Sequence, residues 1–420
     1  MSTSQIRKLM DRTILHCDND AFYSTTEEML NPKLRGKAHA VAGSVEDRNG
    51  IILAKSYVAK KYGVKTGEAI WQAKQKCPDL ITMPPNYEMY LKYSKLASQI
   101  YSDYTDLIQP LGMDEAWLDL TGSTKLFGTG EEIARKLKDR VKYELGLTIS
   151  VGVSFCMVFA KLGSDLNKPD GLCVITEENF REKLWPLPVS DLFGVGFRTD
   201  AVLQRYGIRT IGQLATTPQE LLQRKFGVRG IDLWAYANGL DRSKVQHQEY
   251  ELPIKSIGHG ITTIQDLENT AESWNVILAL TQAVGYKLRK HHKFAGGVAI
   301  HVRNNQLQWK QWQRKLPLAT NSTSTIANAL FQLFAENYKW EYPIRSLSVH
   351  AINLCSDTVP AQISFFSNPQ QIEKEERKYV AVDTLNDRFG EGTIIPAKLL
   401  EQSKMPSPRK VEIRMPRGMI

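Results

Sequence analysis

ILHCDNDAFY, residues 14–23, decides the interpretation of this chain together with LGMDEAWLDL, residues 111–120. Each stretch places acidic residues inside an apolar run with the character of a β-strand. A carboxylate at the edge of an apolar core is costly unless it is paired, hydrogen-bonded or bound to a metal ion. Asp18, Asp114 and Glu115 therefore form a candidate Mg²⁺ site, because this ion takes carboxylate oxygens and accepts phosphate oxygens as further ligands. The alternative is that these acids only cap helices or bond turns at strand ends.

The composition describes a globular chain of 420 residues, long enough for two to four domains. Apolar residues make up 42% of it and charged residues 24%, and no apolar run reaches the roughly 18 residues that a membrane helix needs. The five cysteines show no spacing typical of zinc sites or disulfide frameworks, which predicts a reducing, cytoplasmic location. The net charge of +9 fits a polyanionic partner and equally an ordinary basic protein.

The alternation of strand-like and helix-like segments predicts an α+β core sheet in a multidomain chain. Strands are expected near residues 13–23, 38–42, 107–120 and 148–154, and helices near 57–62, 69–76, 87–104 and 131–145. Short helices separated by Gly and Pro follow over 176–240, and the polar stretch 241–251 has the character of a linker. Residues 254–355 form a second mixed domain, with eleven basic and five acidic residues and strands near 294–303 and 345–354.

A helix-hairpin-helix is predicted by LFGVGFR, residues 192–198, followed by YGIRTIGQL, residues 206–214. Its glycines allow close approach of the backbone and direct N–H groups at a phosphate, without reading base sequence. FGVRG, residues 226–230, is a candidate degenerate second copy. The alternative for the whole region is a plain helical connector.

Two further segments carry residues suited to binding a triphosphate. SYVAKKYGV, residues 56–64, places Tyr57 and Lys60 three residues apart on one helical face. NKPDG, residues 167–171, is a helix stop with Lys168 in the last turn. The alternatives are a solvated basic helix in the first segment and a partner for the helix dipole in the second.

In this order the motifs resemble those of the Y-family DNA polymerases, the lesion-bypass group of DinB/UmuC type. The resemblance runs from residue 12 to residue 366 and also includes AK-x5-NKP at 160–169 and KSIG at 255–258. It implies a right-hand polymerase with a ferredoxin-like palm, small fingers, a helical helix-hairpin-helix thumb and an α/β little finger domain. The implied bounds are 1–23 and 86–172 for the palm, 24–85 for the fingers, 173–245 for the thumb, 246–253 for a linker, 254–356 for the little finger and 357–420 for a tail.

The resemblance also implies roles for individual residues. Asp18, Asp114 and Glu115 would be catalytic and, with the carbonyl of Asn19, would bind two Mg²⁺ ions. Tyr23 would be the steric gate that rejects a ribose 2′-OH. The expected nucleotide contacts are Phe22, Tyr23, Tyr57, Lys60 and Lys168, and the expected DNA contacts are Gly194, Val195, Gly196, Lys255 and Ser256. Lys60 stands where Arg is more common, and Lys lacks the bidentate fork of a guanidinium.

QISFF, residues 362–366, resembles the bacterial sliding-clamp pentapeptide, with Phe365 in place of the usual Leu. A segment that offers one Ile and two Phe to a groove is a reasonable peptide ligand. The residues expected to bind the clamp are Gln362, Ile363, Ser364, Phe365 and Phe366. The alternative is an apolar patch that folds back on its own domain.

The implied function is template-directed, low-fidelity addition of a dNTP to a primer 3′-OH during translesion synthesis. The protein would be a monomeric mutator polymerase of the DNA damage (SOS) response, would bind primer–template DNA, dNTP and the sliding clamp, and would have no proofreading exonuclease and no membrane association. One alternative is a catalytically idle repair scaffold that binds DNA and the clamp. Another is a two-metal nuclease, which would leave Tyr23, Tyr57 and Lys168 unexplained.

Overall fold

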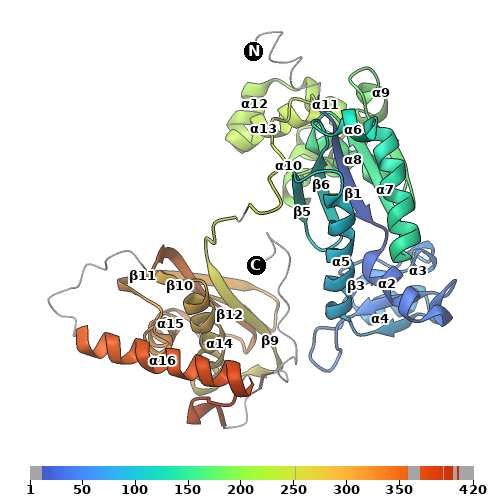
Figure 1. The fold of residues 1–420 in the computed structure, drawn as a ribbon. Helices are drawn as coiled ribbons and strands as arrows, with labels where there is room; N and C mark the ends of the chain where they lie inside the picture. The colour runs from blue at the N-terminus through green and yellow to red at the C-terminus, as the bar shows by residue number, and fades with distance from the viewer. Residues whose placement is uncertain (1–11, 251, 358–368, 391, 401–403, 406–420) are drawn as a thin grey trace. The chain divides into compact units, whose positions relative to one another are not determined.

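The structure, a computed structural model, describes residues 12–250, 252–357, 369–390, 392–400 and 404–405. The described residues form two compact units, one built from 12–42 and 52–250 and the other from 43–51 and 253–405. Both units are drawn in Figure 1, and each is described here by itself. None of the described helices combines the length and the apolar character that crossing a membrane requires.

A five-stranded sheet with the order β5-β6-β1-β7-β8 is the centre of the first unit. Its strands are β1 (Ile14–Asn19), β5 (Ile108–Leu111), β6 (Glu115–Asp119), β7 (Ile149–Ser154) and β8 (Leu172–Val174). β1 and β7 are buried along their whole length, so the polar residues of β1 (His16, Asp18 and Asn19) are buried together with its apolar ones. β1 pairs antiparallel with β6 and β7, and the register places Asp18 opposite both Glu115 and Ser150.

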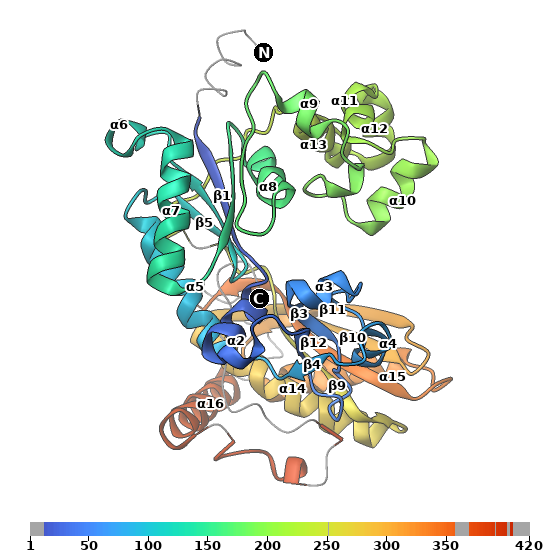
Figure 2. The same ribbon diagram turned by 90° about the vertical axis from the view of Figure 1, so that its right-hand side faces the viewer.

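Helices cover both faces of this sheet, as Figure 2 shows for α7 and α8 on opposite sides of β1. α5 (Tyr87–Ser102) and α7 (Gly130–Leu145) pack on the face that carries Leu15 and Cys17. α8 (Met157–Leu166) packs on the other face, against Ile14. α8 lies so close to β7 that a Cβ on Gly152 would sit 1.9 Å from the carbonyl oxygen of Ala160. This is the ferredoxin-like palm expected from the sequence.

The expected fingers segment contains a small three-stranded sheet with the order β3-β2-β4. Its elements are β2 (His39–Ala42), β3 (Ile52–Lys55), β4 (Ile81–Met83), α2 (Phe22–Leu30), a 3₁₀ turn (Pro32–Leu34), α3 (Tyr57–Lys61) and α4 (Ile70–Lys76). Four alanines, Ala40, Ala42, Ala59 and Ala73, lie in its core, so this core is small. Ser56 caps α3 by accepting a hydrogen bond from the backbone N–H of Ala59, which fixes the start of the helix that carries Tyr57.

The expected thumb consists of short helices around their own core. They are α9 (Phe180–Leu184), a 3₁₀ turn (Val189–Asp191), α10 (Phe197–Arg205), α11 (Ile211–Thr216), α12 (Gln219–Phe226) and α13 (Val228–Ala237). The palm also contains a short helix, α6 (Thr124–Phe127), which precedes α7. The polar segment after α13 then packs on the palm: Val245 is buried beside Ile14, and Asp241 Oδ2 accepts the backbone N–H of Val158 at the start of α8.

The second unit is a four-stranded antiparallel sheet, order β11-β10-β12-β9, covered on one face by two helices (Figure 1). Its elements are β9 (Ile257–Leu267), α14 (Thr270–Lys290), β10 (Lys293–Asn304), β11 (Trp309–Thr320), α15 (Thr323–Asn337), β12 (Ile344–Ser356), α16 (Pro369–Phe389) and a 3₁₀ turn (Ala397–Leu400). α16, which lies in the expected tail, is tied to α14 by a bidentate ion pair between Arg289 and Asp383. Tyr379 of the same helix is buried under the guanidinium of Arg289.

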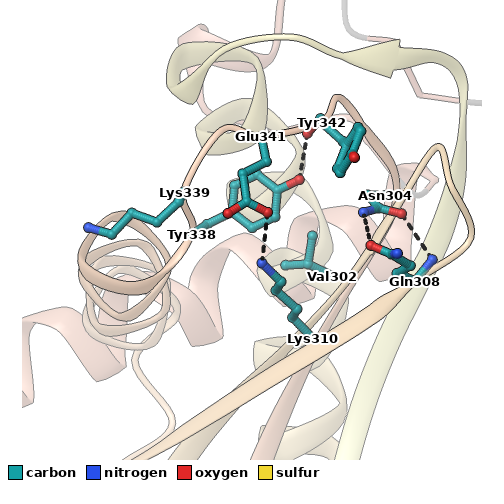
Figure 3. A pocket seen from close by; sticks show the side chains of 8 residues that line it. All are labelled: Val302, Asn304, Gln308, Lys310, Tyr338, Lys339, Glu341 and Tyr342. Carbon is teal, nitrogen blue, oxygen red and sulfur yellow. Dashed lines mark hydrogen bonds and ion pairs between the residues drawn. The ribbon is translucent and has the colours of Figure 1, made fainter.

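A hollow in the second unit, shown in Figure 3, lies between the β10–β11 turn and the loop after α15. Its lining is tied together internally: the hydroxyl of Tyr338 donates to the carbonyl of Tyr342, and Lys310 pairs with Glu341. Asn304 Nδ2 also donates to Gln308 Oε1. The hollow is too narrow to enclose even a water-sized molecule.

Candidate active site

The three predicted carboxylates meet at one end of the palm sheet. Asp18 lies near the end of β1 and Glu115 begins β6, directly opposite in the strand register. Asp114 precedes Glu115, and its carbonyl accepts hydrogen bonds from the Asn19 backbone N–H at 2.8 Å and from Asn19 Nδ2 at 2.9 Å. Asn19 therefore locks the two acidic segments together.

Burial sets the electrostatics of this cluster. Burial raises the pKa of the Asp18 carboxyl, against the opposing effect of the nearby Lys168 ammonium. It also raises the pKa of Asp114 to about 6, with the negative charge of Glu115 as the second cause. Burial acts on Glu115 as well, but a hydrogen bond from His16 and the charge of Lys161 outweigh it and leave the pKa of Glu115 low. Clustered acids whose pKa values are raised by burial are a favourable environment for a cation.

A buried set of side chains from β1 and α8 surrounds Glu115 and was not assigned a role from the sequence. His16 Nε2 lies 3.3 Å from Glu115 Oε2, and Lys161 Nζ lies 2.5 Å from the same oxygen. The other ring nitrogen of His16 is 2.8 Å from the hydroxyl of Ser164. His16, Asp18 and Glu115 are close enough together that their ligand atoms all lie within 4.8 Å of one another.

The predicted triphosphate ligands lie beside the carboxylates. Lys168 Nζ is 2.5 Å from Asp18 Oδ2 and 2.8 Å from Asp165 Oδ1. The Tyr57 hydroxyl donates to Asp20 at 3.3 Å. Lys60 is exposed, one turn along α3, with its ammonium 5.6 Å from the centre of the Tyr57 ring. The structure thus brings Tyr57 and Lys168 to the same corner of the palm and leaves Lys60 at the surface.

The two aromatic residues after β1 differ in exposure. Phe22 is 2% exposed and packs in the palm core, so a contact from Phe22 to a nucleotide would have to come from its backbone. Tyr23 is partly buried, and its hydroxyl lies 3.6 Å from the sulfur of Met113, next to the acidic segment. Burial, and secondly the charge of Asp114, raises the pKa of Tyr23 to about 12, so the phenol stays protonated.

The predicted DNA-binding loop of the thumb has the backbone geometry of a helix-hairpin-helix. Gly194 has a φ of +89°, a conformation that favours glycine, and Gly196 is the N-cap residue of α10. Gly227, in the candidate second copy, has a φ of +61° and separates α12 from α13. The guanidinium of Arg229, in the first turn of α13, covers Gly194, since a Cβ on Gly194 would lie 1.8 Å from Arg229 Nη2. Val195 between the glycines is buried and anchors the loop.

Two sets of predicted contacts lie elsewhere. Lys255 and Ser256 are exposed just before β9 in the second unit. The predicted clamp-binding residues 362–366 fall outside the described part of the chain.

Comparison with known protein families gives three matches. The model described as the impB/mucB/samB family matches residues 17–165, and the model of that family's C-terminal domain matches residues 254–365. A model described as the DNA polymerase-iota thumb domain matches residues 190–241. The matches cover the expected palm, thumb and little finger in the expected order.

Curated relatives agree with these matches. A protein of Acetivibrio thermocellus called DNA polymerase IV is 45% identical, over 91% of this chain and 96% of the relative. Another DNA polymerase IV, from Moorella thermoacetica, is 37% identical over 91% and 95%. DNA polymerase IV 2 of Bacillus subtilis is 34% identical over 93% and 95%.

Among solved structures, a chimeric Y-family DNA polymerase matches with a TM-score of 0.71 and 23% identity. The match covers 82% of this chain and 99% of the chimera. At this identity the match supports the fold.

Proposed function

Because this chain belongs to the impB/mucB/samB family of Y-family DNA polymerases and is a DNA-directed DNA polymerase, we propose that it performs translesion synthesis by a two-Mg²⁺ mechanism. The observation that carries the proposal is the meeting of Asp18, Asp114 and Glu115 at adjacent strand ends, with the hydroxyl of Tyr23 in contact with Met113, the residue before Asp114. The small fingers core leaves few side chains to enclose a base pair, which favours an open, tolerant and low-fidelity pocket.

The metal site would consist of oxygen ligands alone. Asp18, Asp114 and Glu115 would bind the ions, and the carbonyl of Asn19 would add a ligand. When bound, two Mg²⁺ ions lower the pKa of the primer 3′-OH and neutralise charge on the leaving pyrophosphate. The elevated pKa values of Asp18 and Asp114 support this assignment, because a bound cation would remove the cost of ionising buried acids.

The nucleotide would lie with its triphosphate toward Tyr57 and Lys168 and its sugar over Tyr23. Lys168 would exchange its ion pair with Asp18 for one with a phosphate oxygen, since a carboxylate and a phosphate are both anionic acceptors for the Lys168 ammonium. Lys60, which is exposed, would add long-range charge rather than a fixed contact. The backbone at Phe22 would complete the sugar-side wall.

The remaining contacts would hold DNA and recruit the enzyme. Gly194, Val195 and Gly196 would direct backbone N–H groups at one phosphate of the DNA, and Lys255 and Ser256 would contact another. Residues 362–366 would bind the sliding clamp. We further propose a monomeric, cytoplasmic enzyme of the DNA damage (SOS) response with the character of a mutator.

Primer extension with Mg²⁺ tests the proposal on two templates that differ only by one abasic site. The wild-type protein should add nucleotides on both templates, and Asp114→Asn should reduce addition by at least about three orders of magnitude. Asp119→Asn, at the opposite end of β6, is the matched control and should extend normally. Failure of the wild type to extend either primer would favour the DNA- and clamp-binding scaffold, and shortening of the primer would favour the nuclease. Arrest at the abasic site alone would overturn the translesion part.

A further inference from the structure

Asp20 lies two residues beyond Asp18, in the turn that follows β1. It is 1% exposed, and within the described chain its carboxylate has no ion-pair partner. Three donors from three separate segments satisfy it instead: the hydroxyl of Ser150 at 2.7 Å, the backbone N–H of Asp170 at 2.7 Å and the hydroxyl of Tyr57 at 3.3 Å. Burying a carboxylate that has no ion-pair partner is costly, and these three hydrogen bonds offset that cost, so they tie Asp20 to the three segments that donate them.

We propose that Asp20 is a positioning residue for the incoming nucleotide, which places Tyr57 and the turn carrying Lys168 at the correct distance from the metal cluster. The inference rests on the proposed function, in which Tyr57 and Lys168 contact the triphosphate. Asp20 would touch neither the nucleotide nor the metal ions.

The Lys168 side of this arrangement is fixed through the backbone. Asp20 Oδ2 accepts the N–H of Asp170, and the Ser150 hydroxyl, which donates to Asp20 Oδ1, accepts the N–H of Gly171 at 3.2 Å. The backbone of this turn is closely packed, because a Cβ on Gly171 would lie 2.2 Å from the carbonyl oxygen of Asn167. Two consecutive N–H groups are thus anchored two and three residues after Lys168.

The hydrogen bond from Tyr57 to Asp20 is the longest of the three, so Tyr57 can exchange Asp20 for another acceptor. Burial raises the pKa of Tyr57 well above its ordinary value, so the hydroxyl stays protonated and donates to Asp20. At 3.3 Å this hydrogen bond is longer than the two 2.7 Å bonds. A phosphate oxygen can therefore replace Asp20 as the acceptor from Tyr57 while Asp20 keeps the turn in place.

Single-nucleotide insertion kinetics test the inference through the separation of KM and kcat. Asp20→Asn keeps the side-chain shape but directs an NH₂ group at a donor, so one anchored N–H or hydroxyl loses its acceptor. We expect KM for dNTP to rise about tenfold and kcat to change by less than about threefold. Ser150→Ala, which leaves the charge intact, should raise KM by a smaller factor. Asp119→Asn is the control and should change neither constant.

A double-mutant cycle with Lys168→Ala decides whether Asp20 acts through Lys168. If it does, Asp20→Asn should raise KM by a smaller factor in Lys168→Ala than in the wild type, because only the contribution through Tyr57 remains. An equal rise in KM in both backgrounds, or no rise in the wild-type background, would overturn the inference. An unchanged KM in Lys168→Ala itself would instead refute the triphosphate role of Lys168 in the proposed function. If Asp20→Asn fails to fold, the same cycle with Ser150→Ala gives the decision.

Discussion

The ring of Tyr23 stacks on the ring of Tyr90, with centroids 4.2 Å apart and planes only 8° apart. Tyr90 is fully buried in α5, and its hydroxyl donates to Glu27 at 2.6 Å. Tyr87 touches both rings edge-on at about the ring separation that favours such contacts. The proposed steric gate therefore packs on two other aromatic rings, of which that of Tyr90 is fully buried.

The stacking of Tyr23 on Tyr90 predicts that substitutions at these two residues change sugar selectivity to different extents. Tyr23→Ala should let ribonucleotides enter far more readily, with a smaller loss for deoxynucleotides, because the ring proposed to meet the 2′-OH is gone. Tyr90→Leu should relax selectivity by an intermediate factor, since Tyr23 keeps its ring but loses the surface behind it. The measurement is the ratio of kcat/KM for the two sugars, with the 84%-exposed Tyr143→Leu as control. A ratio unchanged in Tyr23→Ala would make Tyr23 a simple core aromatic.

The elements of the palm could be predicted because their sequence patterns reflect burial. The expected helix near 87–104 is α5 (Tyr87–Ser102), and the expected strand near 148–154 is β7 (Ile149–Ser154). β11 (Trp309–Thr320) was not predicted, because several consecutive positions at its start are exposed, which hides the alternation. Helical content was expected in the tail, but the packing of α16 on α14 was not predicted, because it depends on Arg289, nearly a hundred residues earlier.

In the candidate active site, too, some residues could be predicted from the sequence and others could not. Asp114 and Glu115 could be identified because acids stand out inside an apolar run. The residues that hydrogen-bond around these acids could not be identified, because they come from distant segments. His16 contacts Ser164, 148 positions later, and Asp20 contacts Asp170, 150 positions later. Such contacts leave no local pattern, although the two-residue spacing of His16 and Asp18 does place both on one face of β1.

Asp114 should make the metal-free protein less stable at neutral pH. Its pKa is raised by burial to about 6 in the folded state from an ordinary value of 3.8, so the folded state binds the proton more tightly than the unfolded state. Stability from this group is therefore fully present below pH 3.8 and is lost as the pH rises through about 6. Asp114→Asn should raise the unfolding free energy at pH 7.5 in EDTA by roughly 1 to 3 kcal/mol.

Thermal unfolding with and without Mg²⁺ checks this prediction. Mg²⁺ should raise the Tm of the wild type and leave Asp114→Asn nearly unchanged, and the effect on the wild type should fade below pH 6, where Asp114 is protonated. Asp139→Asn, an exposed acid on α7, is the control. An Asp114→Asn protein that is less stable than the wild type in EDTA would contradict the raised pKa.

The uncovered face of the sheet in the second unit should contact the DNA backbone. On β10 and β11 this face carries Arg303, stacked on Trp309, and the exposed Lys315, whereas Lys310 points to the helix-covered face and pairs with Glu341. Arg303→Gln and Lys315→Gln should each reduce the slope of log affinity against log salt by about 0.9, since each cation releases one counterion. Lys310→Gln, on the same strand, should leave the slope unchanged. Equal effects from both faces would show that only total charge matters.

The predicted clamp motif gives a prediction that leaves the chemistry untouched. Ile363, Phe365 and Phe366 are apolar side chains between two folded elements, β12 (Ile344–Ser356) and α16 (Pro369–Phe389). A groove on a ring-shaped clamp would bury them, and tethering would raise the local concentration of polymerase at the primer end. Replacing Gln362, Phe365 and Phe366 with Ala should leave single-nucleotide insertion on a bare template intact. It should abolish both direct clamp binding and stimulation by a loaded clamp. A triple variant that unfolds at lower temperature yet still binds the clamp would place these side chains in the core of their own domain.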